Sequence, residues 1–144
     1  MTERIVFPDI EKTLVDYLTA QLVAASDTAK VVTRIPDPRP PRMVRVLRND
    51  RKLRQDIEDR ESRRGPNLIL DRPRVVLECT DSSGAAADLA SLVRTILSAA
   101  VPGYLGTVWC DYFEDAGIET DIDPASAAPR QTIVADLVVR GKAV

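Results

Sequence analysis

The sequence contains no histidine, only two cysteines and 4% aromatic residues. Without histidine, the chain cannot carry a Ser-His-Asp triad, a Cys-His nucleophile or a His-ligated metal. Cys79 and Cys110 are too few for an all-cysteine structural zinc site, which needs four thiolates. These absences exclude much of catalysis, and we expect no cofactor, no metal and a core filled by Val, Leu, Ile and Ala.

The sequence also lacks an apolar stretch near the 18 or so residues of a membrane span, so no membrane partner is expected. Its first residues, Met-Thr-Glu-Arg-Ile-Val-Phe-Pro, lack the apolar run and cleavage site of a signal peptide. Two cysteines without a secretion signal favour free thiols in a reducing cytoplasm. We expect both to be packed strand residues.

A length of 144 residues is typical of one domain, and 44% apolar with 29% charged residues is ordinary for a globular protein. We therefore treat 1–144 as a single domain. The net charge of −2 hides an uneven distribution: residues 30–74 contain 14 Lys and Arg against 7 Asp and Glu, a local balance of +7, and the remainder carries −9. Such a split often marks recognition of a partner.

Apolar periodicity predicts two amphipathic helices. Large apolar residues recur every four positions in 8–25 and follow an i, i+3, i+4 pattern in 82–100. We expect Pro8 and Asp9 to lie in the first turn of the first helix. The side chains of 81–83 are expected to cap the second helix.

Five stretches with strand character complete the pattern: 30–35, 43–48, 74–80, 107–114 and 132–140. Short connections between consecutive strands favour hairpins. We therefore predict an α+β fold, in which two helices cover a mixed, mostly antiparallel sheet of about five strands. Residues 49–66 are predicted to be a charged loop, and an acidic connection is predicted from the fourth strand to Pro129.

A basic set of side chains lies in the charged loop and the strand before it. It suggests contact with a protein or with phosphates, and the alternative is a solvated, locally salt-bridged loop. Against nucleic acid, the loop also carries acidic residues and has no aromatic side chain for base stacking. The members considered for a protein interface are Arg45, Arg48, Arg51, Lys52, Arg54, Arg60, Arg63 and Arg64.

An acidic set follows the fourth strand. It is interpreted as a patch for a basic partner or as a solvated loop. The Asp-Ile-Asp run at its end suggests a hard-cation site, but the glycine and closing glutamate of an EF-hand are missing. Trp109 nearby is expected to be a core or subunit-contact residue, with a ligand-stacking role as the alternative. The members of the acidic set are Asp111, Glu114, Asp115, Glu119, Asp121 and Asp123.

Three segments resemble the small tail terminator proteins of long-tailed bacteriophages. They are Phe7-Pro-Asp-Ile-Glu-Lys-Thr-Leu-Val-Asp-Tyr-Leu18, then Arg72-Pro-Arg-Val-Val-Leu-Glu-Cys79 leading into the alanine-rich helix at 85–100, and Pro129-Arg-Gln-Thr-Ile-Val-Ala-Asp-Leu-Val-Val139. The resemblance covers roughly residues 7–140 and is one of pattern and element order. The segment 49–66 is longer and more basic than the family suggests.

The resemblance implies a structural protein without enzymatic activity that forms a hexameric ring on the head-proximal end of the tail tube. Such a ring ends tube polymerisation and contacts the major tail tube protein on one side and a head-closure or neck protein on the other. Genome DNA passes through it. The resemblance places the protein in the virion, at the junction of neck and tail, after assembly in the host cytoplasm.

Two other functions remain open: a head-side neck protein of the head-closure type, and a cytoplasmic nucleic-acid-binding adaptor that uses the arginine-rich loop. If the chain forms a homo-oligomeric ring, each subunit presents one face to its left neighbour and another to its right. We then expect the basic and acidic sets to meet across each interface and to orient docking, while apolar contacts supply more of the affinity.

Overall fold

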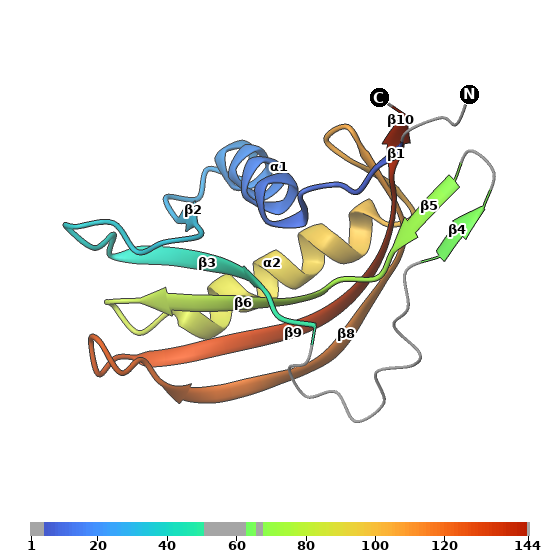
Figure 1. Ribbon diagram of the computed structural model, residues 1–144. Helices are drawn as coiled ribbons and strands as arrows, with labels where there is room; N and C mark the ends of the chain where they lie inside the picture. The colour runs from blue at the N-terminus through green and yellow to red at the C-terminus, as the bar shows by residue number, and fades with distance from the viewer. Residues whose placement is uncertain (1–4, 51–62, 66–67, 144) are drawn as a thin grey trace.

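The computed structural model describes residues 5–50, 63–65 and 68–143. Two helices, α1 (Ile10–Ala24) and α2 (Ala86–Ala100), cover one face of a curved sheet (Figure 1). Most neighbouring strands run antiparallel, and one pair is parallel. The α+β fold predicted from the sequence is therefore confirmed.

The main sheet of the described chain has eight strands, in the order β2-β3-β6-β9-β5-β4, with β8 beside β9 and β7 beside β8. All five predicted strands are present, and short additional strands enlarge the sheet. Its members are β2 (Lys30–Val32), β3 (Arg42–Arg48), β4 (Arg63–Gly65), β5 (Leu68–Asp71), β6 (Arg74–Asp81), β7 (Gly103–Leu105), β8 (Val108–Ile122) and β9 (Pro129–Arg140). Near the chain ends, β1 (Ile5–Val6) pairs with β10 (Lys142–Ala143).

The core between helices and sheet is aliphatic apart from the two cysteines. Leu14 and Leu18 of α1 are fully buried, as is Leu89 of α2. Both cysteines are free and buried on strands, as predicted, and burial raises the pKa of Cys79 to about 12. None of the six aromatic side chains is buried, so all of them lie at or near the surface.

The two helices begin in different ways. The carboxylate of Asp9 is the N-cap of α1 and accepts a hydrogen bond from the backbone N–H of Lys12 at 3.1 Å. The predicted cap of α2 at 81–83 is wrong, because the helix starts later and its N-cap position is Ala85, which has no capping side chain. Asp81 ends β6 instead and accepts hydrogen bonds from the backbone and hydroxyl of Ser83.

The predicted hairpin between the first two strands is also wrong. β2 and β3 are parallel, with Lys30 opposite Met43 and Val32 opposite Arg45. β2 has only three residues, so the connection at 33–41 is long enough to bring the chain back to the start of the pair. Its four prolines cannot donate to a ladder, which suits an extended crossing outside the sheet.

The acidic connection predicted after residue 114 is largely a strand. β8 runs on to Ile122 and forms a long antiparallel hairpin with β9. Beyond Phe113 this strand has few apolar side chains, so apolar alternation does not indicate a strand there. It is a strand because its backbone pairs with β9. Two bulges, one between Cys110 and Tyr112 and one between Asp115 and Gly117, shift its register.

The predicted loop at 49–66 is only partly described. Residues 51–62 and 66–67 lie outside the described residues. Arg63–Gly65 is a strand, not loop, because its backbone pairs with β5. The backbone of Asn49 is tied to the sheet by a hydrogen bond to the carbonyl of Arg74 at 2.8 Å.

Candidate functional site

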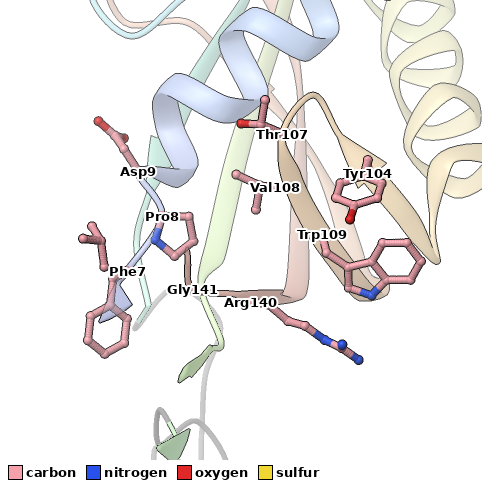
Figure 2. Close-up of a pocket in the computed structure, with 10 residues that line it drawn as sticks. Phe7, Pro8, Asp9, Tyr104, Thr107, Val108, Trp109, Arg140 and Gly141 are labelled. Carbon is pink, nitrogen blue, oxygen red and sulfur yellow. The ribbon is translucent and has the colours of Figure 1, made fainter. Parts of the chain in front are cut away.

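An open groove of about 860 Å³ lies beside the chain ends, and we name it the end groove (Figure 2). Three separate parts of the chain line it: the stretch 6–9 before α1, residues of the β7–β8 hairpin at 104–109, and the end of β9 at 140–141. Most of its side chains are apolar or aromatic. Clefts of this size and composition are typical of binding sites.

Two glycines allow these parts to come together. Gly106 has a φ of +66° in the two-residue turn between β7 and β8, a conformation that most L residues avoid. Gly141 lies where β1 passes: a Cβ there would lie 2.8 Å from a methyl carbon of Ile5 and from the carbonyl oxygen of Val6. A larger residue at Gly141 would push the chain ends apart and open the groove.

One wall of the end groove is a connected aromatic platform. Tyr104 and Trp109 face each other across the β7–β8 ladder, with ring centroids 5.0 Å apart at 82° (Figure 2). The guanidinium carbon of Arg140 lies 5.9 Å from the centroid of the Trp109 ring. Asp111 accepts hydrogen bonds from the Trp109 indole at 2.9 Å and from Arg140 at 2.8 and 2.9 Å. The hydrogen bonds from Arg140 lower the pKa of Asp111, because they favour its ionised carboxylate.

The open side of the end groove exposes apolar surface. Half or more of Val6, Phe7 and Tyr104 is accessible to solvent. Three of the chain's six aromatic side chains line this groove. Tyr, Trp and Arg are the residues most enriched at the energetic centres of protein interfaces, and exposed apolar patches with a polar rim mark interaction sites. The arrangement therefore suits contact with a protein segment.

A second hollow, of about 440 Å³, continues the end groove along α1 and shares Asp9 and Thr107 with it. Tyr17 and Asp16 line this hollow from the helix. Lys12 donates to Asp16 at 2.9 Å, but both side chains are mostly exposed. Such a surface pair contributes little to stability and rearranges easily when a partner arrives.

Three further exposed apolar side chains are Ile35, on the connection after β2, and Ile118 and Ile122, on the far half of β8. They do not form one continuous patch, because Ile35 lines a hollow with Arg45 and Glu78, whereas Ile118 lies opposite the core residue Ile133. We name the end of the molecule that carries them the hairpin-end surface. In Figure 1 that connection and the β8–β9 turn lie at the end of the molecule opposite the two chain termini. The chain therefore presents two different apolar surfaces at its two ends.

The described members of the predicted basic set bind acidic side chains of the same chain. Arg45 donates to Glu78 at 3.5 Å. Arg48 forms a bidentate pair with Asp71, at 2.8 and 3.0 Å, and also contacts Asp50. Arg63 and Arg64 lie in β4, and only their backbone is described. Outside the described residues lie Arg51, Lys52, Arg54 and Arg60.

The predicted acidic set lies on β8 and in the turn after it, and most of its charge is balanced within the chain. Glu114 accepts a hydrogen bond from the hydroxyl of Tyr112 at 2.9 Å, and Glu119 lies opposite Thr132 in the ladder. The other four pair with arginines: Asp111 with Arg140, Asp115 with Arg94, Asp121 with Arg130, and Asp123 with Arg39. The two carboxylates considered as cation ligands thus each hold an arginine.

Within a single chain, the structure links Arg45 of the basic set to Asp121 of the acidic set through Glu78 and Arg130. Arg45 reaches Glu78, and Arg130 bridges Glu78 at 2.9 Å and Asp121 at 2.7 Å. This ladder of alternating charge crosses β3, β6, β9 and β8. A contact between Arg45 of one subunit and Asp121 of the next would therefore compete with these ion pairs inside each chain.

Sequence reasoning singled out Trp109 but missed the end groove around it. The groove joins three segments that are far apart in the sequence, so no local pattern marks it. No signal in the sequence distinguishes the three aromatic residues that line it from Tyr17 and Phe113, which pack against the core.

No protein-family model and no curated protein matches the chain. No helix within the described residues is long and apolar enough to cross a membrane. Among those residues there is also no cluster of three or more Cys, Asp or Glu side chains that could hold a metal ion.

Proposed function

We propose that the chain is a tail terminator: a structural protein whose ring ends tail-tube polymerisation in a long-tailed bacteriophage and joins the tail to the neck. The sequence resemblance supplies the family, and the α+β fold is compatible with it. The ring is a homo-oligomer, and we expect six copies.

The observation that carries the proposal is the pair of unlike apolar surfaces at the two ends of the molecule. A two-fold dimer uses the same patch on both subunits, whereas a ring needs two complementary patches on each subunit. The end groove is concave and aromatic, whereas the hairpin-end surface carries separate aliphatic side chains on a loop and a strand. Head-to-tail contact between them would use both.

In this proposal the flat faces of the ring contact the major tail tube protein on one side and a head-closure or neck protein on the other. Genome DNA passes through the lumen without specific binding. Arg51, Arg54 and Arg60 of the basic set lie outside the described residues, and in this proposal they contact these partners. The protein then belongs to the virion, at the junction of neck and tail.

Deletion of the gene in its phage tests the proposal by electron microscopy of the lysate. We expect filled heads and separate tails of irregular length, because tube growth is no longer stopped. Supplying the wild-type chain from a plasmid should restore tails of one length joined to heads. Tails of normal length attached to heads in the deletion would contradict the proposal.

The same experiment separates the two alternatives. A head-side neck protein would leave tails of regular length that do not join heads. A nucleic-acid adaptor would leave assembled particles, and the purified chain would retain nucleic acid with a steep dependence on salt concentration.

A further inference from the structure

The connection between β2 and β3, residues 33–41, is an exposed loop held firmly at its base, and we name it the proline loop. Residues 33–38 are exposed, and Ile35 exposes 37% of its surface. Near the base, Arg39 pairs with Asp123, and Arg42 pairs with Asp27 at 2.9 Å and with Asp81 at 2.7 Å. Four prolines in six positions restrict the backbone further. A segment ordered in advance loses little entropy on binding.

The chemistry of the end groove matches this loop. Proline-rich segments dock in grooves lined by aromatic side chains, because the rigid pyrrolidine rings pack against aromatic faces at low entropic cost. The end groove offers Phe7, Tyr104 and Trp109 for that contact. Its aromatic platform is held in place by Arg140 and so is preorganised.

The charges of the two surfaces are also complementary. The proline loop exposes Arg34, and the groove and its continuation along α1 expose Asp9 and Asp16. Asp9 caps the helix with one carboxylate oxygen, Oδ1, and its other oxygen is left for a second donor. The loop also exposes Asp37, and the α1 side of the groove exposes Lys12, which is opposite in charge and pairs with Asp16 within the chain.

We infer that the proline loop of one copy docks in the end groove of the next copy, with Ile35 against the aromatic platform and Arg34 beside the carboxylates at the start of α1. The loop and the groove lie at opposite ends of the molecule, so one copy cannot fill its own groove (Figure 1). Such a contact is heterologous and continues from subunit to subunit until a ring closes. The inference deepens the proposed function and rests on the ring that it requires.

Mixing two full-length variants, each defective on one surface, tests the inference by native mass spectrometry. The groove variant carries Phe7→Ala and Tyr104→Ala, and the loop variant carries Arg34→Glu and Ile35→Asp. All four side chains are exposed, so both variants should melt close to the wild type. Each variant alone should need at least about a 30-fold higher concentration for half-assembly, as expected for the loss of an interface hot spot.

An equal mixture, with one variant labelled by ¹⁵N, should give heterodimers of twice the chain mass and no larger rings. Only one working contact remains in that mixture, between the intact loop of the groove variant and the intact groove of the loop variant. The control Val23→Ala changes an exposed residue of α1 that lines neither surface, and it should assemble like the wild type.

Rings that persist in the loop variant would overturn the inference and leave the proposed function standing. Loss of assembly in Ile122→Asp but not in the loop variant would also overturn it, and would make the β8 strand the occupant of the groove. A wild-type chain that stays monomeric at every concentration would contradict the ring and the inference together.

Discussion

Arg74 and Asp136 form a buried ion pair on the sheet face that the helices do not cover. The guanidinium makes two hydrogen bonds to the carboxylate, at 2.7 and 2.6 Å, and both residues are buried. They lie opposite each other on β6 and β9. A bidentate pair of this kind fixes geometry as well as charge, so it helps to set the register of the two central strands.

Replacing Arg74 by alanine should lower the free energy of unfolding by about 1.5–3 kcal/mol, because Asp136 would keep a buried charge with fewer donors. Urea denaturation measures this loss. The matched control is Lys12→Ala, which breaks the exposed pair with Asp16 and should leave stability nearly unchanged. Equal losses of unfolding free energy in the two variants would show that burial does not make the Arg74–Asp136 pair more stabilising than the exposed Lys12–Asp16 pair.

Asp81 should make stability depend on pH in acid. Its pKa is lowered to about 2 by the Ser83 hydroxyl, the Arg42 guanidinium and the Ser83 backbone, from a model-peptide value of 3.8. Because the folded pKa lies below the unfolded one, the stabilisation is present above about pH 4 and is lost as the pH falls toward 2. Unfolding measured between pH 4 and 2 should therefore show a shallower slope in Asp81→Asn than in the wild type. An unchanged slope would contradict this assignment.

At the scale of elements, the start of α1 positions one rim of the end groove. Asp9 caps this helix, and Asp9→Ala should lower the free energy of unfolding by about 1 kcal/mol. Asp9→Ser should keep most of the stability, since a hydroxyl also accepts from the backbone. Asp88→Ala is the control, because Asp88 lies in the first turn of α2 without being its cap. Thermal melts of the three variants make the comparison, and similar losses for Asp9→Ala and Asp88→Ala would refute the capping role.

Both helices, the long strands β3, β6 and β9 and the first half of β8 were predictable, because buried residues in them recur with the helical or strand period. β2 was also predicted, but it has only three residues. Leu14, Leu18 and Leu22 are buried as their spacing indicates, and so is the inward row of β9. The parallel pairing of β2 with β3 was not predictable, since a connection of nine residues permits either direction. The far half of β8 was also missed, because its order comes from backbone pairing with β9 and not from apolar alternation.

The candidate site was predicted less well than the fold. Charge clusters are visible in a sequence, but their partners are not, and the structure pairs four acidic members with arginines from distant segments. The end groove depends on three segments meeting at the chain ends. Only Trp109 among its lining residues carried a functional expectation from the sequence.

At the scale of the whole molecule, these internal pairs change how the predicted charge contact between subunits should be tested. Reversing the acidic set would also break pairs such as Asp121 with Arg130, which fasten the β8–β9 hairpin. A loss of assembly in that variant would then report on the fold as well as on the interface. Reversing Arg51, Arg54, Arg60 and Arg64 instead leaves the Asp121–Arg130 pair of the hairpin intact.

We propose that unlike surfaces at the two ends of the chain join copies into a closed ring. Electron microscopy of the purified wild-type chain, over a range of concentrations, is the direct test. We expect rings in which one rotation relates every subunit to the next, with six subunits and each end groove covered by its neighbour. Two-fold dimers with both end grooves facing each other, or particles that stay monomeric at every concentration, would contradict it.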